Sequence, residues 1–224
     1  MKKIFLSVAA LGCLLSAAPL PALAAMDTLD YTVLRDGSPI GRHTVKVERN
    51  GARTLVSINS DIEVKVLFVS AYRFVQKSTE EWENGKLVRL VSKTHDDGPD
   101  YDLSVATASD GLSVTAAKSV KGKAETAENG GASAAPQTVL PASLWNPETV
   151  RQSSLLNTIH GKVMSVTVAE QGKEPVAVKG ASIPASHYAI RGELERDLWI
   201  DAEGNVVQYQ FKDRTGSQIS YVLR

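Results

Sequence analysis

The segment ERDLWIDAEGNVVQYQF, residues 195–211, holds the densest mixture of carboxylates and aromatic side chains in the chain. It could form an acidic site walled by a tryptophan, or two strands and a turn. Val207, Tyr209 and Phe211 alternate with polar residues, which is the two-residue period of a β-strand. The intervening DAEGN, residues 201–205, contains Asp, Gly and Asn, which favour a turn. The segment is therefore predicted to be a β-hairpin.

The same alternation continues along the rest of the chain, where turn dipeptides separate the apolar runs. These dipeptides are Asp36-Gly37, Asn50-Gly51, Asn84-Gly85, Asp97-Gly98 and Asp110-Gly111. The predicted strands cover residues 29–35, 40–49, 53–59, 62–79, 86–94, 101–108, 112–117, 163–170, 175–178, 186–194, 197–201, 206–212 and 218–223. An open sheet of so many strands tends to curl or to close. The sequence thus predicts an all-β fold with one short helix: a strongly curved antiparallel sheet that forms an incomplete or closed β-barrel.

Residues 62–79 depart from strict alternation. In VKVLFV, residues 64–69, apolar side chains occupy both faces of the extended chain. This pattern predicts two strands bent near Ser70, with an apolar tip that includes Leu67 and Phe68.

Residues 118–138, KSVKGKAETAENGGASAAPQT, are rich in Ala, Gly, Ser and Lys and have almost no apolar periodicity. This composition predicts a flexible surface loop within one β-rich domain, residues 25–224.

One helix is predicted just after this loop. Asn146 followed by Pro147 is a favourable N-cap with proline at the first helical position, and Glu148 suits the positive end of a helix. The helix is expected over residues 147–157 and ends before Gly161.

Residues 1–24 have the order of segments that a secretory signal peptide needs: a basic start, an apolar run and small residues at the end. Cleavage between Ala24 and Ala25 is expected, so the mature protein would be periplasmic. Residues 10–13, Ala-Leu-Gly-Cys, form a degraded lipobox, and the alternative is an exported protein anchored by a lipid on Cys13.

Composition excludes several classes of function. Cys13 is the single cysteine, so cleavage after the signal peptide would leave no disulfide, no thiolate zinc site and no cysteine nucleophile. The chain has 25 basic and 25 acidic residues and no basic stripe, which gives no electrostatic footprint for nucleic acid. No later segment is apolar for long enough to cross a membrane, so the mature chain is expected to have no transmembrane segment.

Few residues suggest catalysis. The four histidines, at positions 43, 95, 160 and 187, show no metal-ligand spacing, and the chain lacks a nucleophile elbow and a phosphate loop. HDDGPD, residues 95–100, offers oxygen ligands for a hard cation, but a turn explains the same residues. EEWE, residues 80–83, could pair carboxylates, but alternation puts Glu81 and Glu83 on a solvated face opposite a buried Trp82. No catalytic residue, metal ligand or cofactor is predicted.

Trp145 lies in the proline-flanked segment LPASLWNP, residues 140–147. It could plug one end of the sheet. Alternatively, it could act as a lid over a cavity that faces the apolar tip, because binding pockets in curved sheets are lined by apolar side chains.

Three segments together resemble a known group: LPASLWNP at residues 140–147, HYAIRGELERDLWIDAEGNVVQYQF at 187–211, and SQISYVLR at 217–224. They resemble an uncharacterised group of exported proteobacterial proteins that carry a domain of unknown function. That group is distantly similar to the lipoprotein carriers LolA and LolB. The resemblance implies a curved, incomplete β-barrel around an apolar cavity, and an apolar ligand. It implies no catalytic residues.

The sequence favours a periplasmic, non-enzymatic binding or carrier protein for a lipid, an acyl chain or another apolar ligand. Leu67, Phe68, Tyr72 and Trp145 are the candidate ligand-binding residues. One alternative is a structural or assembly partner that contacts another envelope protein through a sheet edge or the loop at residues 118–138. The other is an enzyme of unknown class, which would need His95 or His187 within hydrogen-bonding distance of a carboxylate in a concave pocket.

Overall fold

The computed structural model describes residues 25–125 and 131–224. The predicted signal peptide, the cleavage after Ala24 and the lipid anchor at Cys13 fall on residues 1–24, outside the described residues.

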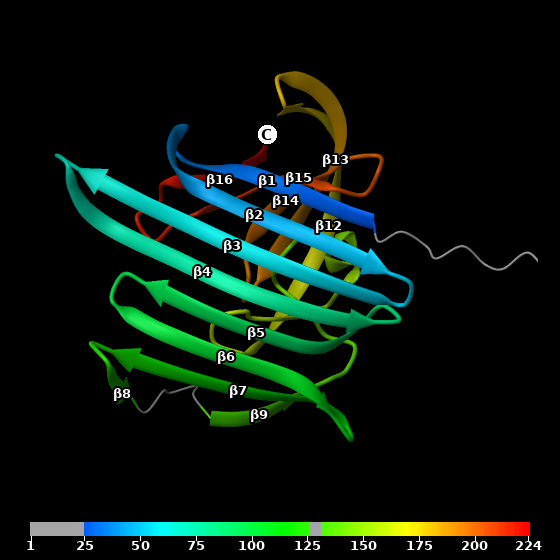
Figure 1. Ribbon diagram of the computed structural model, residues 1–224. Coiled ribbons are helices and arrows are strands. Elements are labelled where there is room, and N and C mark those ends of the chain that lie inside the picture. Colours follow the sequence, from blue (N-terminus) through cyan, green and yellow to red (C-terminus); the bar gives the residue numbers. More distant parts are fainter. Residues whose placement is uncertain (1–24, 126–130) are drawn as a thin grey trace, which may run out of the picture.

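The described chain is almost entirely β-structure (Figure 1). The first strands are β1 (Ala25–Arg35), β2 (Ser38–Asn50), β3 (Arg53–Val66), β4 (Val69–Glu83), β5 (Lys86–Asp96), β6 (Pro99–Ala108) and β7 (Gly111–Val120), followed by β8 (Lys123–Glu125), β9 (Gly131–Ala135) and β10 (Leu140–Pro141). After the 3-10 helix η1 (Pro147–Arg151) come β11 (Ser154–Leu156), β12 (Val163–Val178), β13 (Ala181–Gly192), β14 (Arg196–Ile200), β15 (Val206–Lys212) and β16 (Gln218–Leu223). None of the helices in the described residues is long and apolar enough to span a membrane.

All sixteen strands belong to one sheet. Its order is β10-β11-β12-β13-β14-β15-β16-β1-β2-β3-β4-β5-β6-β7-β8, with β9 also paired to β7. The pairs are antiparallel except for β10 and β11. The two ends of this order are not hydrogen-bonded to each other, so the sheet forms an incomplete barrel. The predicted all-β, strongly curved antiparallel fold is confirmed.

Strand alternation sets the inner face of the barrel. In β2, His43, Val45 and Val47 are buried while the residues between them are more exposed. The same face of β4 carries Gln76, Ser78, Glu80 and Trp82 and is also buried, although it is mostly polar. The barrel interior therefore combines an apolar core with a row of buried polar groups.

A segment that we name the strap, residues 136–161, contains β10 and β11 at one end of the sheet order and packs against β4, β6 and β7 on the other side of the barrel. Trp145 of the strap packs edge-on against Trp82 of β4, with ring centroids 5.7 Å apart. At the other end of the strap, Gly161 lies so close to β6 and β7 that a Cβ atom would come within 2.6 Å of the Val114 side chain and 2.8 Å of the Leu103 side chain. A larger residue at position 161 would push the strap off the sheet.

The predicted helix over residues 147–157 is wrong in length and type. Asn146 does cap the segment, since its side chain accepts a hydrogen bond from the Glu148 amide, but the 3-10 helix ends at Arg151. Ser154–Leu156 then forms β11, whose Leu155 and Leu156 are fully buried. Pairing with β12 outweighs the helical propensity of this stretch.

Three other predicted boundaries are also wrong. Residues 53–59 continue without a break to Val66 as β3, and residues 163–170 and 175–178 are one strand, β12, with a bulge between Glu170 and Gly172. In the predicted loop at 118–138, the described residues include the end of β7 and the short strands β8 and β9, which pair with β7, while residues 126–130 lie outside the described residues. These edge strands were not predicted, because their sequence is rich in Ala, Ser and Lys and has no apolar alternation.

Beyond the bulge in β12, the β12–β13 hairpin extends as an arm, residues 172–186, which arches away from the other strands in Figure 1. Val176, Val178 and Ala185 of the arm are buried, and Trp199 of β14 donates a hydrogen bond to Glu174 near the base of the arm. The arm is thus attached to β14 at its base.

The predicted hairpin at residues 195–211 is confirmed as β14 and β15, with Trp199 opposite Gln208. The Asp201 carboxylate accepts hydrogen bonds from the amides of Glu203 and Asn205, so it serves the turn.

Candidate functional site

The turn between β3 and β4 carries the most exposed large apolar side chains of the described residues. Leu67 is 88% exposed, Phe68 is 100% exposed and Val69 is 67% exposed. We name these three residues the tip, which projects at the upper left in Figure 1. The chain reverses at Leu67 and Phe68, not at Ser70, because Val66 pairs directly with Val69. The apolar tip lies at the predicted residues, Leu67 and Phe68, and only the bend is two to three residues earlier than predicted.

The tip also has an unusual backbone. Leu67 and Phe68 have φ angles of 49° and 69°, the positive values of a type I′ turn. Other two-residue hairpin turns in the described chain, such as Asp36-Gly37 and Asn84-Gly85, place glycine second. Bulky residues with positive φ are strained and tend to occur at functional sites. Strain and exposure at the same two residues make this turn the candidate site.

Tyr72, another predicted ligand residue, lies near the start of β4 on the inner face. Its hydroxyl donates a 2.8 Å hydrogen bond to Asp96 of β5. Partial burial, together with this bond, raises its pKa above the ordinary value. Tyr72 is thus a fixed hydrogen-bonded side chain at the end of the barrel from which the tip projects.

Further inside, His43 lies among three tyrosines. Its ring makes contacts with Tyr31, Tyr209 and Tyr221 at centroid distances of 5.6, 6.3 and 5.4 Å. Nδ1 shares a 2.7 Å hydrogen bond with Ser60 Oγ, while Nε2 is buried and has no partner among the described residues. Burial lowers the pKa of His43 to about 4. The ring is therefore neutral at physiological pH.

Trp145 belongs to a different part of the barrel. Its indole Nε1 donates a 2.8 Å hydrogen bond to Glu80 Oε2, which also accepts a 3.0 Å bond from Trp82 Nε1. Trp82 lies fourteen positions beyond Phe68 along β4, a separation of roughly 45 Å in an extended strand. The structure does not bring Trp145 together with the tip, so Trp145 is a plug and does not cover Leu67 or Phe68.

Glu80 is the residue that sequence reasoning missed. The predicted solvated face of EEWE, residues 80–83, holds for Glu81 and Glu83, but Glu80 is 0% exposed. Burial raises its pKa above the ordinary glutamate value of 4.5. The signal was present in the sequence, because alternation places Glu80 on the same face as Trp82.

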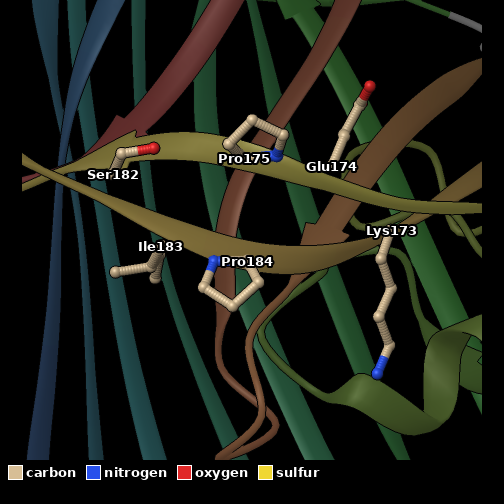
Figure 2. Close-up of a pocket in the computed structure, with 6 residues that line it drawn as sticks. All are labelled: Lys173, Glu174, Pro175, Ser182, Ile183 and Pro184. Atoms are coloured by element: carbon tan, nitrogen blue, oxygen red, sulfur yellow. The ribbon is translucent and has the colours of Figure 1, made fainter.

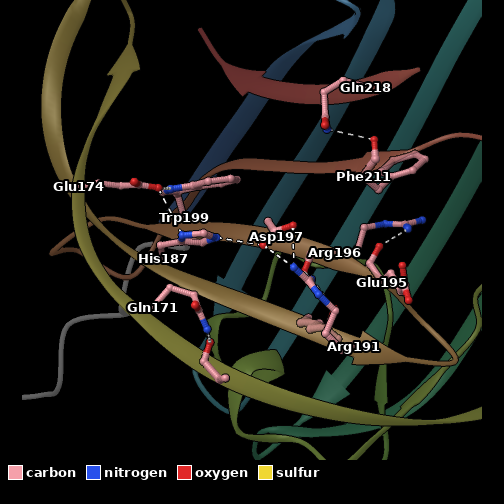
Figure 3. A network of polar contacts seen from close by, with 12 residues as sticks. Gln171, Glu174, His187, Arg191, Glu195, Arg196, Asp197, Trp199, Phe211 and Gln218 are labelled. Atoms are coloured by element: carbon pink, nitrogen blue, oxygen red, sulfur yellow. Dashed lines mark hydrogen bonds and ion pairs between the residues drawn. The ribbon is translucent and has the colours of Figure 1, made fainter. Parts of the chain in front are cut away.

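His187 lies between two carboxylates at the base of the arm (Figure 3). Its Nε2 is 3.0 Å from Asp197 Oδ1, and its Nδ1 is 3.3 Å from Glu174 Oε1. The imidazole stacks on Trp199 with centroids 4.4 Å apart, and Arg191 donates two hydrogen bonds to Asp197. Both ring nitrogens therefore face carboxylates of the protein itself. The arrangement ties the arm to β14.

His95 also lies within hydrogen-bonding distance of a carboxylate: its Nδ1 is 2.8 Å from Asp100 Oδ1. Both side chains are exposed on the β5–β6 hairpin. The predicted turn at residues 95–100 is confirmed, with positive φ at Asp97 and Gly98.

Two surface cavities are formed by other residues. One, of about 260 Å³, lies on the arm, where Pro175 and Pro184 face each other across the hairpin and Glu174 and Ile183 flank them (Figure 2). The second, of about 370 Å³, lies around the β4–β5 turn and includes Asn84. Neither is lined by a predicted ligand residue.

The family model for a domain of unknown function, DUF6134, matches residues 31–224. No curated protein matches the chain. Among solved structures, the chain is similar to a β-barrel-like protein of domain of unknown function DUF1849 from Brucella abortus, with 13% sequence identity and a TM-score of 0.57. The likeness covers 90% of this chain and 95% of that one, and it shows the barrel-like fold alone.

Proposed function

The chain belongs to the DUF6134 family, a domain of unknown function, and we propose that it is an exported, non-enzymatic binding or carrier protein that takes up the acyl chain of a lipid at the tip. Export is the expectation from residues 1–24. The single observation that carries the proposal is the solvent exposure of Leu67, Phe68 and Val69 on a strained turn.

Energetics support an apolar ligand. Full burial of a large apolar side chain contributes about 1.5 to 3 kcal/mol, so a tip of three such residues gains several kcal/mol when it leaves water. A turn that served only to reverse the chain would be more stable with Asn-Gly, as at Asn84-Gly85. At the tip, apolar side chains remain in water and the turn lacks Asn-Gly, so the free protein is less stable than it could be. Both costs support a role of these side chains in binding an apolar ligand.

No catalytic step is proposed. His43 and Glu80 are buried, and both ring nitrogens of His187 face carboxylates. These placements support a binding role for the barrel rather than chemistry on a substrate.

Vesicle co-sedimentation tests the proposal. The native protein is expected to sediment with vesicles of neutral phosphatidylcholine, and the double variant Leu67→Asn/Phe68→Gly is expected to stay in the supernatant. Asn-Gly suits the turn, so loss of binding cannot come from loss of the fold. Phe68→Leu is the matched control, because it keeps an apolar side chain and should retain binding.

Two outcomes would overturn this function. Equal sedimentation of the native protein and the double variant would mean that the tip does not contact lipid. Failure of the native protein to bind vesicles, combined with capture of one envelope protein that the double variant loses, would favour the assembly-partner alternative.

A further inference from the structure

Arg196 is a partly buried cation packed against an aromatic ring. It shares the inner face of β14 with Leu198, and its guanidinium carbon lies 3.7 Å from the centroid of the Phe211 ring (Figure 3). Within the described residues its one hydrogen bond runs from Nη1 to the carbonyl oxygen of its neighbour Glu195, at 2.7 Å. The other N–H groups of this guanidinium have no hydrogen-bond acceptor among the described residues.

Arg196 differs in this respect from almost every other arginine in the chain. Nine of the eleven arginines form ion pairs with carboxylates within the described residues. The two without such a pair are Arg196 and Arg214, and Arg214 is exposed in the β15–β16 turn. Arg196 alone combines burial with the lack of a carboxylate.

A guanidinium in this position loses hydration, and a single backbone carbonyl does not replace it. Burial lowers the pKa of Arg196, while the nearby hydroxyls of Tyr209 and Tyr221 act in the opposite direction. Contact with Phe211 adds a cation–π attraction. An anion in front of the guanidinium would accept the hydrogen bonds that the protein does not supply, because arginine binds carboxylate and phosphate through two parallel hydrogen bonds.

The register of the sheet places Arg196 at the end of the barrel that carries the tip. One row of paired residues runs across the strands through Tyr209, Tyr221, Val33, Gly41, Ile62 and Phe74. Phe211 and Tyr72 lie one inward-facing position beyond this row, both toward the β3–β4 turn. Arg196 and Tyr72 thus lie at the same end of the barrel, six strands apart in the sheet order, and Phe68 is roughly 13 Å from Tyr72 along the strand.

We propose that Arg196, with the hydroxyls of Tyr209 and Tyr221, binds the acidic head group of an amphiphile whose acyl chain lies toward the tip. The ligand class is therefore an anionic amphiphile, with a carboxylate or a phosphate at its head. This inference rests on the proposed function and adds the charge of the ligand to it.

The test compares a fluorescent fatty acid, dansyl-undecanoic acid, with its methyl ester, which has the same chain and no charge. The native protein is expected to bind the acid more tightly than the ester by about tenfold or more, the ratio given by one charge-assisted contact. In Arg196→Met the ratio should fall close to one, because methionine keeps the contact with Phe211 but has no charge. Arg196→Lys should give an intermediate ratio, since it keeps the charge and loses the fork.

Arg214→Met is the matched control: it removes the other arginine that has no ion pair, and it should leave the ratio unchanged. Urea unfolding of each variant separates a local effect from a loss of the fold, and Arg196→Lys provides a second variant if Arg196→Met is unstable. Competition by lysophosphatidylglycerol against competition by dodecanoate distinguishes a phosphate head group from a free carboxylate.

Equal binding of acid and ester by the native protein would overturn this inference and leave the proposed function standing. The same holds if Arg196→Met keeps the full preference for the acid. Binding of neither probe, together with no sedimentation on phosphatidylcholine vesicles, would overturn the proposed function itself.

Discussion

Glu80 is a buried carboxyl group that holds two tryptophans in place. Its Oε2 accepts the indole N–H groups of Trp82 on the sheet and Trp145 on the strap, while its Oε1 has no partner among the described residues. The strap and the sheet are thus connected through one side chain. Loss of that side chain would leave two buried indole donors without an acceptor.

Replacement of Glu80 by alanine is expected to lower the free energy of unfolding by about 2 to 6 kcal/mol, since each buried donor left unpaired costs about 1 to 3 kcal/mol. Glu80→Gln should cost less, because the amide oxygen still accepts both indoles. Urea unfolding measures both values. Glu81→Ala, next to it on the exposed face, is the control and should have little effect; equal losses for Glu80→Ala and Glu81→Ala would contradict the role of Glu80.

In the β14–β15 hairpin, stability is expected to depend on the tryptophan more than on the acid. Trp199 is 5% exposed, so Trp199→Ala should cost about 3 to 5 kcal/mol, the usual range for a buried tryptophan. Asp201→Ala removes only bonds within the turn and should cost about 1 kcal/mol. Thermal unfolding of the two variants decides between them, and the reverse order would revive an acidic site at this hairpin.

Single residues were predicted well where strand alternation alone decided burial. The hairpin at residues 195–211 and the buried Trp82 follow from the two-residue period. The burial of Glu80 and His43 could not be predicted in this way, because charged and polar residues are normally exposed. Glu80 is accommodated in the interior by its contact with Trp145, and His43 by its contacts with the tyrosines.

The tip is an element whose shape conflicts with its sequence. A two-residue turn with positive φ at both positions favours Asn-Gly, and Leu67 and Phe68 each cost about 1 to 3 kcal/mol in strain. The Leu67→Asn/Phe68→Gly variant is therefore expected to raise the free energy of unfolding by about 2 to 6 kcal/mol. Thermal unfolding measures the gain. The reciprocal change, Asn84→Leu/Gly85→Phe, should lower stability by a similar amount; no difference in either variant would mean that the turn is unstrained.

The arm depends on a few polar contacts at its base. His187 faces Glu174 on the arm and Asp197 on β14, so His187→Ala removes one of two side-chain links between these elements and leaves the hydrogen bond from Trp199 to Glu174. Limited proteolysis is expected to cut within residues 172–186 severalfold faster in this variant. His95→Ala removes an exposed histidine–carboxylate pair on another hairpin and is the control. An unchanged cleavage rate in His187→Ala would show that apolar packing holds the arm without the histidine.

Elements with strong apolar alternation were predictable, and elements held by edge pairing were not. β14, β15 and β16 were expected within one or two residues. β8, β9 and β11 were missed because their residues are small, polar or helix-favouring, and only pairing with β7 or β12 makes them strands. The candidate site followed the same rule: sequence identified Leu67 and Phe68 as apolar, but their strained turn became visible only in the backbone.

For the whole molecule, two buried titratable groups act on stability in opposite directions. His43 has a folded pKa of about 4, below its ordinary value of 6.5, so its contribution is complete above pH 6.5 and is lost as pH falls toward 4. The shift corresponds to roughly 3 kcal/mol. Glu80 has a raised folded pKa, so its contribution is complete below pH 4.5 and is lost as pH rises above that value. Between pH 4.5 and 6.5 the two slopes oppose each other.

This opposition predicts the pH profiles of two variants. His43→Gln should make the free energy of unfolding decrease more steeply with rising pH between 4.5 and 6.5, because only the Glu80 slope remains. Glu80→Gln should make it increase more steeply over the same range, because only the His43 slope remains. Urea titrations at half-unit pH intervals measure the slopes, which do not depend on the overall stability of each variant. Identical slopes in all three proteins would mean that neither group is buried in the folded state.

The barrel as a whole could be predicted from the number and length of the strands, since so wide a sheet must curve. Its closure could not. The strap has little periodicity, and the contacts that hold it, such as that of Gly161 against Leu103 and Val114, join parts of the chain more than forty positions apart. Arg196 was likewise unremarkable in sequence, because only the fold shows that it lacks a carboxylate.

The pairing of β1 with β16 has a consequence for how the chain folds. Tyr31 lies beside Leu223, so the first strand acquires one of its two neighbours only when the last residues have been synthesised. Pairings between residues so far apart in sequence slow folding, typically to milliseconds or seconds, because a very long loop must close first. Until then β1 is an open edge and the interior is incomplete. A chain shortened by its last six residues would keep fifteen strands and still lack the contact that joins its two halves.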